Sequence, residues 1–171
     1  MNAIIIVHSL TGTTRKFADR IAGKMKEDGY SVSLTQIETD VPITSGSTRS
    51  CAKFSITNLP DITKYDLVLL GGPVWGFSAS PVIIACINAL GDLQGKKVLP
   101  FVTMGFPFKF MGGKPAIGLM SRNAAEKNAT ILPGFIVSKL FHDIKNDMDK
   151  AAVLISSLLK PTQWQNKNSI T

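Results

Sequence analysis

The sequence lacks the signatures of several common functional classes. Its two cysteines and two histidines match no metal-ligand spacing, and the cysteines form no redox pair. Neither a G-x-x-x-x-G-K-[ST] phosphate loop nor a G-x-G-x-x-G dinucleotide fingerprint occurs. Its longest apolar runs fall far short of the roughly eighteen residues that a membrane-spanning helix needs. We therefore expect no membrane span, no metal centre of a familiar type and no P-loop chemistry.

Residue patterns for nucleophilic catalysis are missing as well. No nucleophile elbow stands in a Ser, Asp and His order, and Cys51 has no arginine six residues later, as a phosphatase loop would require. Receiver domains need acidic residues after the first strand, where this chain has His8 and Ser9. We interpret His8 as a packed residue at the edge of a loop rather than as a base.

Acidic residues are scarce in the second half of the chain. Residues 1–95 carry eight basic and eight acidic side chains, whereas residues 96–171 carry eleven and four, so the whole net charge of +7 lies there. The lysines are spread singly over several predicted elements, which favours a solvated surface over a specific nucleic-acid site. An acidic partner remains compatible with this charge.

Length and composition predict one globular domain. The chain has 171 residues, of which 44% are hydrophobic, and this is enough to build a full core. We expect the domain to span residues 1–160 and a loose polar tail to follow at 161–171. The N-terminus starts a strand without a basic region or cleavage site, and two separated cysteines suit a reducing compartment, so a cytoplasmic location is expected.

Strand and helix patterns alternate along the chain. Apolar runs predict strands at 3–7, 31–37, 66–70, 97–103 and 130–138, although Pro100 is awkward inside a central strand. Helical periodicity and end signals predict helices at 14–28, 81–90, 115–127 and 144–160. Residues 38–62 show no helical period and form a long irregular connection or a poor helix. Such alternation predicts an α/β fold with a parallel sheet and helices on both faces.

The turn after the first strand has the composition of a phosphate cradle. Free N–H groups of a helix N-terminus, with the positive end of the helix dipole behind them, attract anions. Hydroxyl side chains add donors, and Gly12 lets the backbone approach closely. No lysine or arginine lies in this turn, which suits a phosphate monoester held without metal. Its residues are Ser9, Leu10, Thr11, Gly12, Thr13 and Thr14.

Two further loops are expected beside this cradle, because ligands of open α/β sheets bind beyond the carboxyl ends of the strands. The loop after the third strand carries Trp75 between Pro73 and Gly76, and the loop after the fourth carries Gly105 and Phe106. A large aromatic on a glycine-bordered loop can stack on a flat ring. The three loops together predict a ligand with a phosphate and a planar, partly apolar ring.

The two motifs resemble those of the flavodoxin family. Residues 9–14 follow its S/T-x-T-G-x-T phosphate loop. Gly72, Pro73, Val74 and Trp75 fall within its G-x-P-V/I-W segment, and the Ser80 and Pro81 helix start follows. The resemblance covers about residues 3–160 and implies a doubly wound five-stranded parallel sheet of order 2-1-3-4-5, of the short-chain type. It also implies the cofactor FMN.

By this resemblance, three segments contact FMN. Residues 9–14 hold the phosphate. One face of the isoalloxazine is lined by Pro73, Val74, Trp75, Gly76 and Phe77, and the other side meets Thr103, Met104, Gly105 and Phe106. The basic charge departs from the acidic surface of electron-shuttling flavodoxins, and Lys109 and Lys114 border the third loop.

The function implied is FMN-dependent electron transfer with redox partner proteins or small electron acceptors, including acidic ones. Two alternatives remain open at this point. An FMN-dependent NAD(P)H:quinone or nitro reductase would need an open flavin face, so whether the protein is an enzyme is not decided by the sequence. A flavin-free α/β module that uses its basic half to bind an acidic partner is the alternative of another class.

Overall fold

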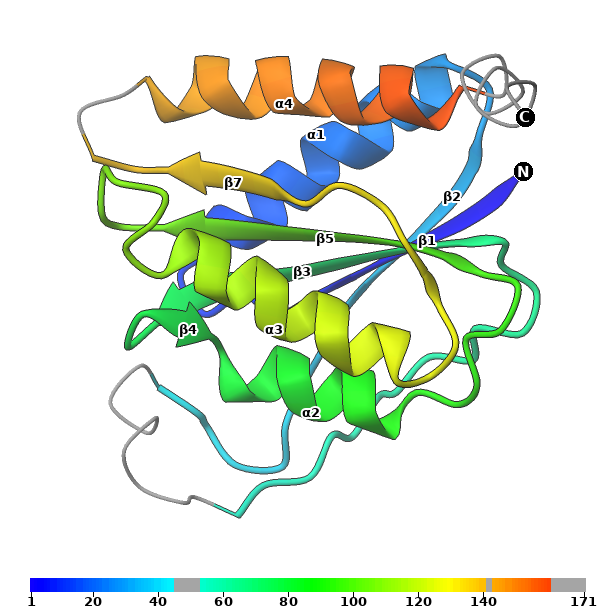
Figure 1. Cartoon of the computed structure of the whole chain (residues 1–171), viewed down its shortest axis with the longest axis horizontal. Helices are drawn as coiled ribbons and strands as arrows, with labels where there is room; N and C mark the ends of the chain where they lie inside the picture. Colours follow the sequence, from blue (N-terminus) through cyan, green and yellow to red (C-terminus); the bar gives the residue numbers. More distant parts are fainter. Residues whose placement is uncertain (45–52, 141–142, 161–171) are drawn as a thin grey trace, which may run out of the picture.

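A parallel sheet with a pair of helices on each face forms the fold (Figure 1). The structure is a computed structural model, and it describes residues 1–44, 53–140 and 143–160. The predicted tail at 161–171 lies outside the described residues. In chain order the elements are β1 (Asn2–Val7), α1 (Thr13–Glu27), β2 (Ser31–Gln36), β3 (Leu67–Trp75), β4 (Ser78–Ala79), α2 (Pro81–Ala89), β5 (Lys97–Met104), α3 (Gly113–Ala125), β6 (Thr130–Ile131), β7 (Phe135–Ser138) and α4 (Ile144–Leu159).

The strand order confirms the predicted fold class. The main path of the sheet runs β2-β1-β3-β5-β6, with β7 also paired to β5, and all of these pairs are parallel. This is the predicted order 2-1-3-4-5 once β4 is set aside as a short antiparallel addition to β3. The order reverses at β1 and β3, so their carboxyl ends open a crevice there.

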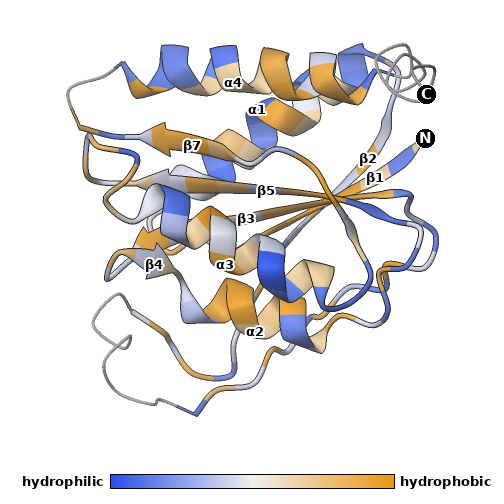
Figure 2. Cartoon of the chain, viewed as in Figure 1, coloured by the Kyte–Doolittle hydropathy of each residue, from blue (hydrophilic) through white to orange (hydrophobic). Residues whose placement is uncertain are grey.

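Two hydrophobic layers flank the sheet. The side chains of α1 and α4 pack on one face together with Ile5 and Phe101, and those of α2 and α3 pack on the other with Val68 and Val102. In Figure 2 the central strands are coloured almost wholly as hydrophobic, as expected for strands covered on both faces. Cys86 lies fully buried in the layer of α2 and α3, and this burial raises the pKa of its thiol to about 12.

The predicted fifth strand at 130–138 is interrupted, which corrects that prediction. Its two parts, β6 and β7, are separated by residues 132–134, which include Pro133. The carbonyl of Val98 accepts from Leu132 N–H at 2.8 Å. Pro100 lies two residues further along β5, so its backbone nitrogen, which has no hydrogen to donate, faces the same neighbouring segment. Pro100 therefore fits a central strand because the adjacent strand is broken beside it.

Other boundaries move by smaller amounts. β3 continues past the predicted end at residue 70 to Trp75 and folds back into β4, and α3 begins at Gly113 rather than at 115. The described arms of the 38–62 connection run antiparallel at its base, where Asp40 N–H donates to Ser55 O and Thr57 N–H to Glu38 O. No helix in the described parts of the chain combines the length and the hydropathy that a membrane crossing demands.

Candidate functional site

The turn between β1 and α1 presents free backbone donors. Gly12 has φ 79, a left-handed conformation that favours glycine, and a Cβ there would project into open space. The side chain of Ser9 accepts from Arg15 N–H at 3.2 Å and so caps the third residue of the helix. The N–H groups of Thr13 and Thr14 meet no acceptor among the described residues. These two amides are therefore available to an anion.

The threonine hydroxyls of this turn fall into two groups. Thr14 is buried, and its hydroxyl bonds that of Thr103 at 2.7 Å, which ties the start of α1 to β5. Thr11 and Thr13 are more open, with their hydroxyls 3.4 Å apart. Hence Thr11 and Thr13 are the side chains that can turn toward a ligand, whereas Thr14 and Thr103 fix the frame behind them.

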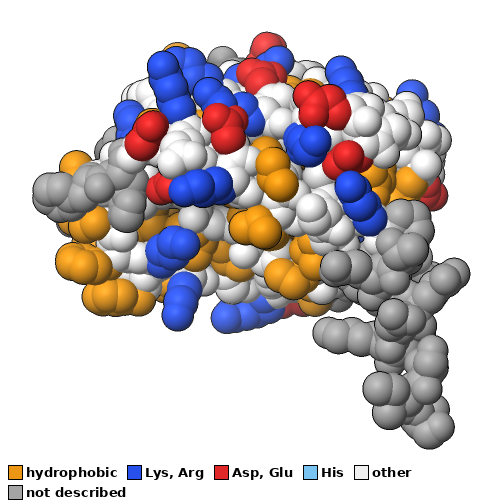
Figure 3. Space-filling view, turned by 90° about the horizontal axis from the view of Figure 1, so that it is seen from above, with side chains coloured by type: hydrophobic (Ala, Val, Ile, Leu, Met, Phe, Trp, Pro, Cys, Tyr) orange, Lys and Arg blue, Asp and Glu red, His pale blue; other side chains and the backbone are white. Residues whose placement is uncertain are grey.

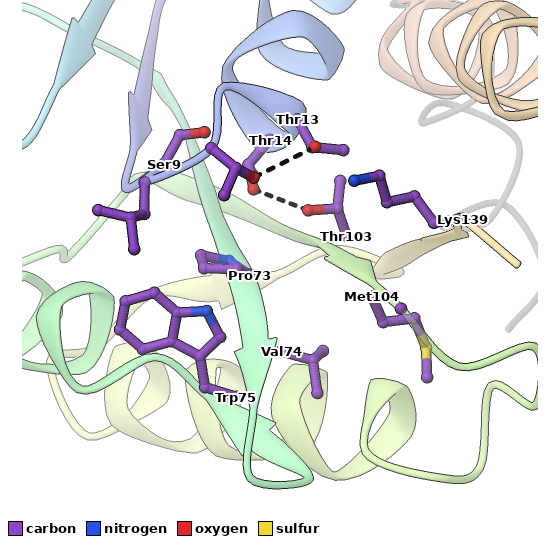
Figure 4. A pocket seen from close by; sticks show the side chains of 12 residues that line it. Ser9, Thr13, Thr14, Pro73, Val74, Trp75, Thr103, Met104 and Lys139 are labelled. Carbon is purple, nitrogen blue, oxygen red and sulfur yellow. Dashed lines mark hydrogen bonds between the residues drawn. The ribbon is translucent and has the colours of Figure 1, made fainter. Parts of the chain in front are cut away.

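A cavity of about 170 Å³ lies between the loops after β1, β3 and β5 (Figure 4). In this view Trp75 and Val74 stand on one side and the threonine hydroxyls on the other, with Pro73 between them. Most of the predicted residues line it, and they are Ser9, Leu10, Thr11, Thr13, Thr14, Pro73, Val74, Trp75, Thr103, Met104 and Gly105. Four predicted residues lie outside the lining: Gly12, Gly76, Phe77 and Phe106.

A tight hairpin carries Trp75 into the cavity. Trp75 pairs with Ser78 across the turn, and the two residues between them both have positive φ, 55 at Gly76 and 64 at Phe77. Such a two-residue turn suits glycine, but a bulky aromatic in the left-handed region is strained by about 1–2 kcal/mol. The Phe77 ring is 53% exposed and lies 5.5 Å from that of Phe106. The strained turn therefore places the Phe77 ring beside that of Phe106 at the edge of the cavity.

His8 supports Trp75 from behind. Its ring meets that of Trp75 edge-on at 5.1 Å, and its Nδ1 is 2.8 Å from the hydroxyl of Ser80, the N-cap of α2. Burial lowers the pKa of His8 to about 4, so the ring is neutral at pH 7. The interpretation of His8 as a packed residue fits this position, because it is buried and joins the loop after β1 to the start of α2.

Lys139 also lines the cavity, and the sequence analysis missed it. It follows directly on β7, whose carboxyl end lies beside that of β5. The predicted strand already ended at residue 138, as β7 does, so the rule that ligands bind beyond the carboxyl ends of strands could have indicated Lys139. The lining contains no other charged side chain.

The fold and the cavity together define a class of protein: a doubly wound α/β protein with a cavity at the switch point of its sheet. The flavodoxin family model matches residues 2–109, well over half of the chain, and the chain belongs to the flavodoxin family. It is thus an FMN-binding protein that exchanges electrons with redox partners.

Solved flavodoxins share the fold. Oxidised flavodoxin 1 from Bacillus cereus is 21% identical, with a TM-score of 0.65 over 92% of this chain and 96% of that one. The flavodoxin of Streptococcus pneumoniae is 14% identical, with a TM-score of 0.65 over 93% and 97%. Two-electron reduced Megasphaera elsdenii flavodoxin is 20% identical, with a TM-score of 0.63 over 91% and 98%. No curated protein sequence matches the chain.

The residues present fit FMN. The two open amides at the start of α1 and the hydroxyls of Thr11 and Thr13 suit its phosphate, and no carboxylate lines the cavity to repel it. Trp75, Val74 and Met104 give the other side of the cavity the apolar surface that an isoalloxazine needs. No group of three or more His, Cys, Asp or Glu able to hold a metal occurs within the described residues.

Proposed function

We propose that FMN binds in this cavity with its phosphate on the N-terminus of α1 and its isoalloxazine beside Trp75, and that the protein passes electrons to acidic partners. One observation carries the placement. Two unpartnered amides and two open hydroxyls face the same cavity as a tryptophan held by a hairpin. A phosphate at one end and a flat ring at the other match these two chemistries.

FMN supplies the redox chemistry, and the residues of the chain orient it. Thr13 and Thr14 offer N–H groups at a helix N-terminus, where a phosphate dianion is stabilised without a metal. Trp75 covers the ring with its indole, and Val74 and Met104 exclude water from that region. The buried His8 and Ser80 hold the indole in place. Gly76 has a positive φ, which the tight turn after Trp75 requires.

The rim of the cavity supports an acidic partner. Four phenylalanines on two loops, Phe77, Phe106, Phe108 and Phe110, are each more than half exposed. Lys109 and Lys114 lie among and beside them and are exposed as well. On the α1 and α4 face shown in Figure 3, charged side chains of both signs are mixed, and hydrophobic ones gather near the edge where β5 and β7 end. An apolar rim with lysines favours a partner that has carboxylates around an apolar patch. We also expect a cytoplasmic location, on the grounds of the sequence alone.

Amide chemical shifts test the placement of the cofactor. FMN is added to ¹⁵N-labelled, flavin-free protein, and riboflavin serves as the control because it lacks only the phosphate. We expect FMN to shift the amides of Thr13, Thr14 and Trp75, and riboflavin to shift that of Trp75 while leaving the two threonines almost unmoved. Shifts centred on the separate apolar cavity between the β3–β4 hairpin and α2 would overturn the proposal.

Ionic strength tests the partner. The rate at which the reduced protein gives electrons to hexacyanoferrate(III), an anionic acceptor, should fall as salt rises, because surface charges are screened beyond about 10 Å at 0.1 M. Lys109→Gln with Lys114→Gln should flatten this dependence. Lys26→Gln with Lys64→Gln, at the other end of the sheet, should not. A wild-type rate that does not change with salt would contradict the acidic-partner proposal.

A further inference from the structure

The backbone of Lys139 is fixed at the edge of the cavity. Its N–H donates to the carbonyl of Met104 at 2.8 Å, which extends the pairing of β7 with β5 by one residue. Just before it, the hydroxyl of Ser138 donates to the carbonyl of Phe106. Two neighbouring anchors on the loop after β5 therefore set where the Lys139 side chain begins.

The pleat of β7 directs this side chain toward α1. Val137 pairs with Thr103 in register and packs into the core layer of α1 and α4. Residues two apart in a strand point to the same face, so Lys139 leaves the strand on the α1 side. Figure 4 shows its amine directed toward the side of the cavity that carries Thr13 and Thr103, away from Trp75. The amine thus points into the part of the cavity that the start of α1 lines.

Among the described residues, no negative charge accounts for this position. The cavity lining has no carboxylate, and the first turn of α1 has no acidic residue. Arg15, a basic residue of that turn, is paired with Asp19 at 3.0 Å. Within the described parts of the chain Lys139 forms no salt bridge. Lys139 therefore brings an uncompensated cation to a site built from neutral donors.

We propose that Lys139 binds the phosphate of FMN from the side opposite the loop of residues 9–14, an inference that rests on the proposed placement of the phosphate. A phosphate monoester carries a charge of about −1.5 to −2 at pH 7, more than two amides and two hydroxyls balance. An ammonium on a flexible four-carbon stem can approach such a dianion as a point charge. The phosphate site thus takes its neutral donors from the first loop and its charge from β7.

Binding of FMN and riboflavin to Lys139→Gln tests this assignment. The glutamine keeps a polar side chain and removes the charge, and Lys26→Gln, on the last turn of α1, is the control of equal charge. We expect Lys139→Gln to weaken FMN binding by about threefold to tenfold, as for a partly solvated charge pair, with riboflavin binding unchanged. FMN affinity should also fall less steeply with salt in Lys139→Gln than in the wild type. Lys139→Arg should restore most of the affinity.

Three outcomes separate this inference from the placement on which it rests. Equal FMN affinity in wild type and Lys139→Gln, with FMN weakened by Thr11→Ala and Thr13→Ala, would overturn the role of Lys139 and leave the placement standing. An equal loss for FMN and riboflavin in Lys139→Gln would put the amine against the ring and overturn the inference too. If the threonine changes also leave FMN binding intact, the placement itself fails.

Discussion

The two ends of the cavity differ in the chemistry of their side chains and in the strain of their backbone. At the α1 end the donors are backbone amides and short hydroxyls on regular structure, and the Thr14–Thr103 bond of 2.7 Å locks the helix to the sheet. At the other end Trp75 is only partly exposed, Phe77 and Phe106 are more than half exposed at the rim, and the turn after Trp75 has two residues of positive φ.

This difference suggests a division of labour. The polar end, at the N-terminus of α1, can bind an anion without a change of conformation, and we expect it to contact only the phosphate. At the other end a strained turn and the exposed rings of Phe77 and Phe106 are suited to contacts that change when the partner changes, while His8 and Ser80 keep Trp75 in place. Affinity for the phosphate and control of the ring are therefore expected to respond to different substitutions.

Removal of the free hydroxyls should have the largest effect at the polar end. Thr11→Ala combined with Thr13→Ala should weaken FMN by at least about tenfold, because each hydrogen bond to a charged oxygen contributes about 1.5–3 kcal/mol. Riboflavin affinity should hardly change, and neither should FMN affinity in the control Thr130→Ala, on exposed β6. Titration followed by flavin fluorescence measures all of these. A parallel loss for both ligands would erase the distinction between the two ends.

Truncation of Trp75 should act in the opposite way. Trp75→Ala should weaken FMN and riboflavin alike, by about 1–3 kcal/mol for lost stacking. Trp75→Phe retains a ring and should recover much of this loss. The same fluorescence titration applies. If only FMN binding suffered, Trp75 would be acting on the phosphate, and the assignment of the ring to this end would be wrong.

Acid should weaken the support of Trp75 through His8. The folded-state pKa of about 4 lies below the unfolded value of 6.5, so the unfolded state takes up the proton first. Stability is full above pH 6.5 and falls by up to about 1.4 kcal/mol per pH unit down to pH 4. Urea unfolding of the flavin-free protein between pH 7 and pH 4.5 should show this slope, and His8→Gln should lack its contribution. Identical pH profiles for the two proteins would contradict it.

Strain at the hairpin should give the smallest effect. Phe77→Gly and Phe77→Ala both remove the ring, but only glycine adopts a φ of 64 without strain. The glycine variant should therefore be more stable than the alanine variant by about 1 kcal/mol, the reverse of the order found in regular strands and helices. Thermal or urea unfolding decides this, and a more stable alanine variant would show that the turn is relaxed.

Much of the polar end could be predicted from the sequence because its signal is local. A buried strand ends at Val7, hydroxyls and Gly12 follow, and a helix starts at Thr13, all within one short segment. The strand order and Trp75 followed from alternation of the elements and from the family resemblance. The family resemblance also indicated the third loop. Of the residues predicted there, Thr103, Met104 and Gly105 line the cavity, whereas Phe106 does not.

Features that depend on contacts between distant segments were not predicted. The break in the last strand lies between the pairs Val98–Ile131 and Phe101–Phe135, beside Pro100, and the sequence alone does not give these registers. Lys139 was missed because the sequence, although it predicts the strand end at residue 138, does not show on which face of the sheet the next side chain lies. The positive φ of Phe77 arises because β3 continues into a hairpin with β4, which no propensity of phenylalanine indicates.

The ratio of FMN affinity to riboflavin affinity, measured by fluorescence titration of the wild-type protein and of the Thr11→Ala, Thr13→Ala variant, tests the central claim most directly. The division between a phosphate end and a ring end predicts that the wild type prefers FMN by at least about tenfold, because only FMN can accept two or more hydrogen bonds from this loop through its charged phosphate. It also predicts that the variant loses most of this preference while riboflavin binding persists. Equal affinities for the two flavins in the wild-type protein would contradict the account.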